Sequence, residues 1–113
     1  MPRRKINYES APAAVADAIA RLGRNIALAR VRRRMREEDL ATHAGISRVT
    51  LRRIEDGELG TGIGAYAAVL WALGFQDDLA EILSPEHDLE GQTLEASRHA
   101  LRVRPAKGLS DDF

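Results

Sequence analysis

A chain of 113 residues without cysteine, in which 17 basic residues balance 17 acidic ones, can hold one modest hydrophobic core. Its composition excludes disulfides, thiolate zinc sites and a cysteine nucleophile, and no apolar run approaches the roughly 20 residues of a membrane-spanning helix. Residues 1–57 carry 13 Lys and Arg against 7 Asp and Glu, whereas residues 58–113 carry 4 against 10. This asymmetry indicates a basic half facing DNA and an acidic half facing another partner, although solvated surface charges can also segregate without a role.

The chain opens with a polar, basic segment, residues 1–10, that is expected to be a flexible arm. One long helix is predicted from about residue 11 to residue 34, with Ser10 as its cap and Pro12 in its first turn. Its apolar residues recur every three or four positions, as a single helical face requires: Val15, Ile19, Leu22 and Ile26.

The segment from Glu37 to Gly57 reads as two short helices joined by a tight turn. Gly45 can adopt the left-handed conformation that ends the first helix, and Ser47 can cap the second helix through its hydroxyl. The small side chain of Ala41 lets the two helices approach closely. The apolar residues with helical spacing are Leu40, Ala41, Ala44, Leu51 and Ile54.

The second helix of this segment has the features of a DNA-reading helix. Ile46, Leu51 and Ile54 are predicted to anchor it on the body of the domain. The side chains left facing outward are Arg48, Val49, Thr50, Arg52 and Arg53. A short helix that is fixed by apolar residues and presents arginines and a hydroxyl group is what base and phosphate contacts require.

Two further helices are predicted after a glycine-rich loop, residues 58–62. Thr61 can cap the first of them, residues 63–73, whose inward stripe comprises Ile63, Tyr66, Val69, Leu70 and Leu73. Trp71 lies off this stripe, which favours a contact with a partner over partial burial in its own domain. The second helix is expected to run from Gln76 to Leu83, with Leu79, Ile82 and Leu83 facing inward.

The last segment, residues 84–113, is weakly patterned. Leu89, Leu94, Ala96 and Leu101 are consistent with a short helix that ends near Arg102. The terminal residues combine two apolar anchors with two acids, a pattern typical of a docking peptide that orders on a partner, or of a frayed terminus without a role. The docking residues would be Leu109, Asp111, Asp112 and Phe113.

Catalytic and metal-binding patterns are not found in the sequence. His43, His87 and His99 are far apart and none has a neighbour at ligand spacing, so no metal site or cofactor is expected. The acids Glu37, Glu38 and Asp39 begin a helix, where they suit the positive end of the helix dipole better than acid–base catalysis. We therefore expect a protein that is not an enzyme.

The segment from Glu37 to Gly57 resembles the lambda-repressor/Cro-type helix-turn-helix, or XRE family, in the order and spacing of its residues. The matching residues are Leu40-Ala41, Ala44-Gly45-Ile46-Ser47, Leu51 and Ile54-Glu55-x-Gly57. The resemblance extends from about Leu22 to Phe75. It implies an all-α, five-helix lambda-repressor-like domain over residues 11–83, with an extended first helix, followed by a C-terminal tail that is flexible or binds a partner.

The family resemblance also implies roles for individual residues. Arg30 and Glu55 would form an ion pair that stabilises the fold. Base edges would be read by Arg48, Val49 and Arg53. Phosphates would be held by Arg36, Ser47, Thr50 and Arg52. The sequence departs from the family where members often begin the first helix of the motif with Thr-Gln, since Arg36 and Glu37 stand there and a glutamate is unsuited to a phosphate.

The same resemblance implies a cytoplasmic homodimer on double-stranded DNA with a palindromic operator. The short tail ending Gly-Leu-Ser-Asp-Asp-Phe is similar to that of HipB-like antitoxins, which neutralise a HipA-like protein kinase toxin and repress their own operon. In that case Trp71 and the tail would bind the toxin. Two alternatives remain: a stand-alone XRE-family repressor, and an interaction module that has lost DNA binding.

Overall fold

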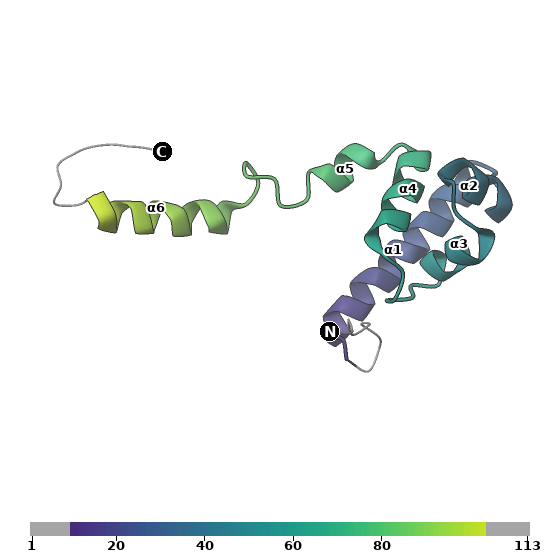
Figure 1. Ribbon diagram of the computed structural model, residues 1–113, viewed down its shortest axis with the longest axis horizontal. Helices are drawn as coiled ribbons and strands as arrows, with labels where there is room; N and C mark the ends of the chain where they lie inside the picture. The colour runs from purple at the N-terminus through teal and green to yellow at the C-terminus, as the bar shows by residue number, and fades with distance from the viewer. Residues whose placement is uncertain (1–9, 104–113) are drawn as a thin grey trace, which may run out of the picture. The chain divides into compact units, whose positions relative to one another are not determined.

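The computed structural model of the chain describes residues 10–103. The regular secondary structure of this part of the chain consists only of helices, which confirms the predicted all-α fold class. The chain divides after Leu79 into two compact units. The helices are α1 (Ala13–Arg32), α2 (Glu37–Ala44), α3 (Arg48–Glu55), α4 (Ile63–Leu73), α5 (Gln76–Ala80) and α6 (Leu89–Val103) (Figure 1). No helix within residues 10–103 has the length and apolar character to cross a membrane.

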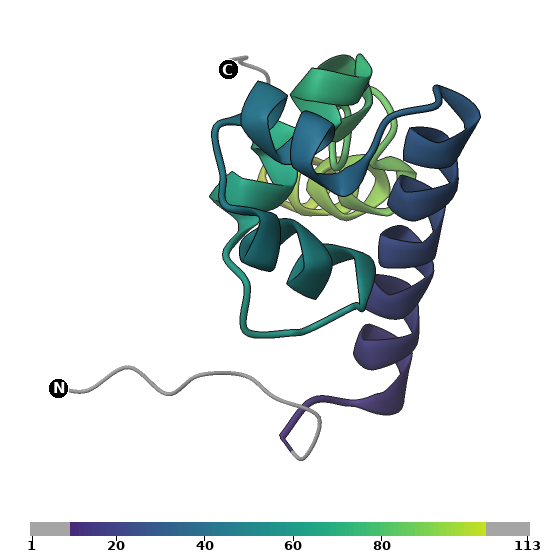
Figure 2. The same cartoon turned by 90° about the vertical axis from the view of Figure 1, so that its right-hand side faces the viewer.

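The first unit is organised around the packing of α2 and α3 against their neighbours. The helix α2 contacts both α3 and α4, and α1 packs along α3 and α4 (Figure 2). The apolar stripes of four helices therefore share one core. Its largest fully buried side chains are Leu40, Leu51, Ile54 and Val69. Burying each such side chain stabilises the fold by roughly 1.5–3 kcal/mol.

The first helix is slightly shorter at both ends than its sequence pattern predicts. It begins at Ala13, and the residue before it is Pro12, whose carbonyl oxygen accepts the first amide hydrogen bonds, from Val15 and Ala16. The N-cap position is occupied by Pro12, two residues after Ser10, so the prediction of Ser10 as the cap is wrong. The helix ends at Arg32 because Arg34 adopts a left-handed conformation with φ 56°.

The turn between α2 and α3 follows the sequence closely. Gly45 adopts φ 75°, and its amide donates to the carbonyl of Thr42, which closes the end of α2. Two residues later, the Oγ of Ser47 accepts a hydrogen bond of 3.0 Å from the amide of Thr50. Ser47 thus caps α3, and the two helices meet across a turn of three residues.

The start of α4 differs from the prediction. Gly62, not Thr61, is the residue before the helix, and no side chain caps it. Ile63 was predicted to face inward but is 75% exposed, because it lies at the very first helical position, ahead of the turn that reaches the core. Tyr66, together with Val69 and Leu73 on the same face, is buried as predicted.

The fifth helix ends at Ala80, three residues earlier than predicted. Leu83 adopts φ 63°, which no α-helix continues through, and it is 81% exposed. Ile82 is also exposed, so the prediction that both face inward is wrong. In the second unit, the sixth helix is confirmed and runs to Val103. The carboxylate of Asp88 accepts a hydrogen bond of 3.0 Å from the amide of Gly91 in its first turn.

Candidate DNA-binding interface

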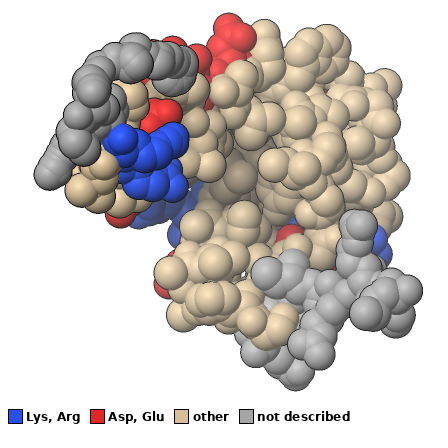
Figure 3. All heavy atoms as spheres, turned by 60° about the vertical axis from the view of Figure 1, so that its left-hand side comes forward, with Lys and Arg blue, Asp and Glu red and all other residues tan. Residues whose placement is uncertain are grey.

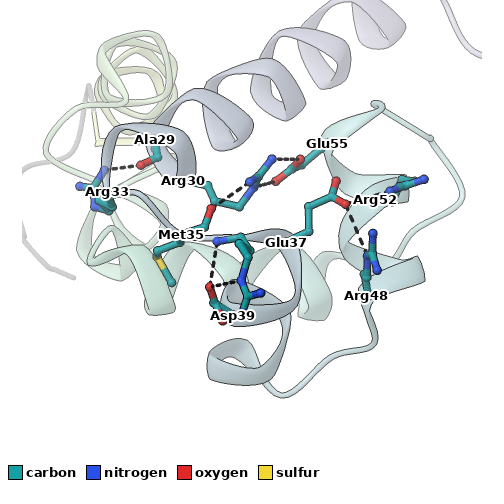
Figure 4. A network of polar contacts seen from close by, with 10 residues as sticks. Ala29, Arg30, Arg33, Met35, Glu37, Asp39, Arg48, Arg52 and Glu55 are labelled. Atoms are coloured by element: carbon teal, nitrogen blue, oxygen red, sulfur yellow. Dashed lines mark hydrogen bonds and ion pairs between the residues drawn. The ribbon is translucent and has the colours of Figure 1, made fainter.

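Charged side chains are distributed unevenly over the described residues. On the face drawn in Figure 3, uncharged side chains cover most of the surface. Basic side chains gather instead around the end of α1 and the helices α2 and α3, where they form the network of polar contacts in Figure 4. The candidate interface is built from this network.

The helix α3 separates its buried and exposed residues cleanly. Leu51 and Ile54 are completely buried, and they fix the helix on α1 and α2. Val49, on the opposite side, is 59% exposed, although it is apolar. The side chains of Arg48, Arg52 and Arg53 are all more than half exposed. The inner face of α3 is therefore fixed, and its outer face is available to a ligand.

The exposed residues of α3 form two pairs with helical spacing. Arg48 and Arg52 lie four residues apart, on the side near the start of α2, and both contact Glu37. Val49 and Arg53 form the second pair, displaced by one residue around the helix. Arg53 makes a long contact of 4.0 Å with Glu58. The outer face of α3 therefore has one arginine pair next to an acid and a second, separate pair.

The two hydroxyl groups at the start of α3 are bonded to each other. Ser47 Oγ donates to Thr50 Oγ1 across 2.9 Å while it accepts from the Thr50 amide. Ser47 is exposed and Thr50 is half-buried. Both hydroxyls lie at the helix N-terminus, where backbone amides and the helix dipole also favour an anion.

Arg36 immediately precedes α2, and its side chain is exposed. Its backbone amide donates to Asp39 Oδ2 across 2.9 Å, and its Nε lies 3.4 Å from the same oxygen. The hydrogen bond from the Arg36 amide, followed by that from its side chain, lowers the pKa of Asp39. The acid therefore caps the helix, as its position in the first turn suggests.

Arg30 and Glu55 join the end of α1 to the end of α3. The Arg30 Nε and Nη2 donate to the two carboxylate oxygens of Glu55 across 2.7 and 3.0 Å. Arg30 Nη1 also donates to the carbonyl of Met35 across 3.0 Å. The hydrogen bond to Glu55 raises the pKa of Arg30 against the effect of partial burial. This pair lies inside the domain, where both side chains are mostly buried and join α1 to α3.

Trp71 lies on α4 and is 55% exposed. Its ring centroid lies 5.4 Å from that of His43 on α2. Nearby in the chain, Phe75 lies under the guanidinium of Arg33, with 5.8 Å from its ring centroid to Arg33 Cζ. These aromatic residues are separate from the face of α3. The other predicted partner residues, Leu109, Asp111, Asp112 and Phe113, lie outside the described residues.

Residues 10–103 contain no group of three or more side chains suited to hold a metal ion. His43 is paired with Trp71, and His87 Nδ1 lies 2.7 Å from Ser84 Oγ and 3.5 Å from Glu81. Each of these histidines is thus in a local contact of its own.

Sequence reasoning missed the role of Glu37. Its Oε1 accepts a hydrogen bond of 2.9 Å from Arg52 Nη2 and lies 3.6 Å from Arg48 Nε (Figure 4). The sequence signal was a glutamate where the resembling family often has glutamine. By itself that departure indicates only the loss of a phosphate contact, because the sequence does not show that α3 lies beside Glu37.

Comparison with known protein families gives one match. A family model described as a helix-turn-helix domain matches residues 21–83, more than half of the chain. No curated protein and no solved structure matches the chain. The match begins inside α1 and includes the whole of α2, α3, α4 and α5.

Proposed function

The chain belongs to the helix-turn-helix domain family, and from this premise we propose that it is a sequence-specific transcriptional repressor that binds DNA as a homodimer. The observation that carries the proposal is the outer face of α3. Three arginines and one apolar side chain are exposed there, while Leu51 and Ile54 hold the helix in place. Helix-turn-helix domains insert such a helix into the major groove.

The two pairs of exposed residues on α3 suggest that some of these side chains contact bases and others contact phosphates. Arg53 and Arg48 each have the paired donors that match O6 and N7 of guanine, and Val49 has the apolar surface that suits a thymine methyl group. Ser47, Thr50 and Arg52 lie toward the start of the helix or toward α2, where phosphate contacts are expected. Arg36, exposed at the start of α2, is assigned to a phosphate as well.

Dimerisation follows from the size of the recognition surface. One short helix reads only a few base pairs, so high specificity requires two copies on successive major grooves, about 34–36 Å apart, on a palindromic operator. Exposed apolar side chains in the described part of the second unit provide candidate contacts between copies: Ile82, Leu83, Leu89, Leu94 and Leu101.

A matched pair of substitutions tests the assignment on α3. We expect Arg53→Ala to weaken operator binding by roughly 1–3 kcal/mol and to relax the preference at one base pair. Arg52→Ala should weaken binding to all sequences alike and reduce the slope of log K against log salt by about 1. The measurement is salt-dependent binding to an operator selected from random duplex DNA and to its single-base variants. Loss of non-specific affinity alone in both variants contradicts the role of Arg53.

We further propose that the protein is an antitoxin that binds a HipA-like kinase toxin through Trp71 and the acidic half of the chain. The exposed ring of Trp71 favours a protein contact, since large aromatic side chains are enriched at such interfaces. A stand-alone repressor is the alternative, and it requires no role for Trp71. The exposed Arg48, Arg52 and Arg53 speak against an interaction module without DNA binding.

A native pull-down distinguishes the antitoxin from the stand-alone repressor. We expect the full chain, but not a chain truncated after Arg104 or a Trp71→Ala variant, to retain one stoichiometric partner with a protein kinase fold. All three proteins should bind the selected operator equally. Tight operator binding by the full chain without any such partner leaves the stand-alone repressor as the function.

A further inference from the structure

Glu37 is the one acid in residues 10–103 that contacts two arginines on the exposed face of α3. It is the first residue of α2, and its side chain is only 21% exposed, whereas Arg48 and Arg52 are more than half exposed. A single carboxylate oxygen lies 2.9 Å from Arg52 Nη2 and 3.6 Å from Arg48 Nε. Figure 4 shows the carboxylate directed from α2 toward α3.

The carboxylate of Glu37 is ionised wherever the protein is folded near neutral pH. The hydrogen bond from Arg52 lowers its pKa, and the positive charges of Arg52, Arg30 and Arg48 add to this effect against partial desolvation. The same contact raises the pKa of Arg52. Glu37 and its two arginines are therefore all charged before the protein meets DNA.

Stability of the fold gives little reason for this arrangement. The pair between Glu37 and Arg52 lies at the surface, where the Arg52 side chain is 56% exposed, and surface ion pairs contribute at most about 1 kcal/mol. The buried side chains of Leu40, Ala41 and Leu51 already fix α2 against α3. The main effect of Glu37 must fall on the two arginines.

The geometry lets an arginine keep Glu37 while it reads a base. Arginine has five N–H donors in a rigid fork. Arg48 faces Glu37 with Nε, so the edge formed by its two terminal nitrogens remains for guanine. A DNA phosphate that binds either arginine, in contrast, must approach the negative charge of Glu37 or displace the Glu37 carboxylate.

We propose that Glu37 is a specificity-determining residue, which holds Arg48 in position for base contacts and opposes the capture of Arg48 and Arg52 by DNA phosphates. The inference rests on the proposed function, that α3 meets DNA. Non-specific binding consists almost entirely of phosphate contacts, so the charge of Glu37 weakens it most. Operator binding also includes base contacts, which Glu37 leaves intact. The acid thereby raises the ratio of operator to non-operator affinity.

The test compares Glu37→Gln with Glu38→Gln in the full chain. Both substitutions remove one negative charge from the first turn of α2, but Glu38 contacts only Arg36, at 3.9 Å. The probes are a duplex selected by the unmodified chain from random DNA and a scrambled duplex of the same length. We expect Glu37→Gln to bind the scrambled duplex about fivefold more tightly, corresponding to the upper range of an exposed ion pair. Its operator affinity should change by less than twofold, and Glu38→Gln should change neither.

Two further readouts separate this role from a structural one. The salt dependence of scrambled-duplex binding should become steeper in Glu37→Gln, because more phosphate contacts form. Thermal unfolding should show both variants folded, with similar midpoints. An equal gain on both duplexes, or no gain, overturns the inference. If the unmodified chain selects no sequence at all, it is the proposed function that fails.

Discussion

Gly23→Ala is expected to destabilise the domain by about 3 kcal/mol, although alanine is the better helix former. Gly23 lies inside α1, where this helix crosses the end of α3. A Cβ atom at this position would collide with the carbonyl oxygen of Ile54 and lie 2.7 Å from that of Glu55. Both obstacles are backbone atoms, so the helices must move apart. Denaturant unfolding of the purified variant measures the loss.

Gly64→Ala provides the matched control. Gly64 also lies in a helix, but no atom would lie within 4 Å of a Cβ added there. The same substitution should therefore stabilise the domain, by up to about 1 kcal/mol from helix propensity. Opposite signs for the two variants identify close packing as the cause. If Gly23→Ala is as stable as the unmodified protein, the close approach of α1 to α3 is wrong.

Glu55→Gln is expected to cost about 3 kcal/mol of folding free energy. The Glu55 side chain is 7% exposed and accepts two hydrogen bonds from Arg30, which is itself mostly buried. The amide keeps the size of the side chain but removes its charge and offers a single acceptor. The guanidinium would keep its bond to the carbonyl of Met35 and one bond to the amide oxygen, but no negative charge would balance it. Removing one member of a buried pair leaves the other charge without compensation, which is strongly destabilising.

Two comparisons test whether the loss of folding free energy in Glu55→Gln comes from the broken ion pair with Arg30. Glu58→Gln removes an acid whose contact with Arg53 is long and exposed, and it should cost less than about 1 kcal/mol. In a double-mutant cycle, Arg30→Met should add little once Glu55→Gln is present, because both substitutions break the same pair. Additive losses would show that the two residues stabilise the domain independently.

The local structure of the motif could be predicted because its signals lie close together in the chain. Gly45 ends α2 and Ser47 caps α3 through interactions that span only a few residues. The burial of Leu51 and Ile54 follows from helical spacing. Where local signals were weak, the predictions failed. The left-handed conformation of Leu83, which shortens α5, has no glycine to indicate it.

The sequence by itself determined the all-α class, the position of the two central helices and which side of α3 is exposed, because helical periodicity and capping act over neighbouring residues. Only the tertiary structure decided which distant residues meet. No local pattern in the sequence indicates that position 23 requires glycine, because the requirement arises only where α1 crosses α3. Glu37 and Arg52 are 15 positions apart, and their contact exists because the turn at Gly45 sets α3 against α2, so that Arg52 in the middle of α3 reaches the start of α2. Such contacts depend on the packing of whole helices, which periodicity alone does not specify.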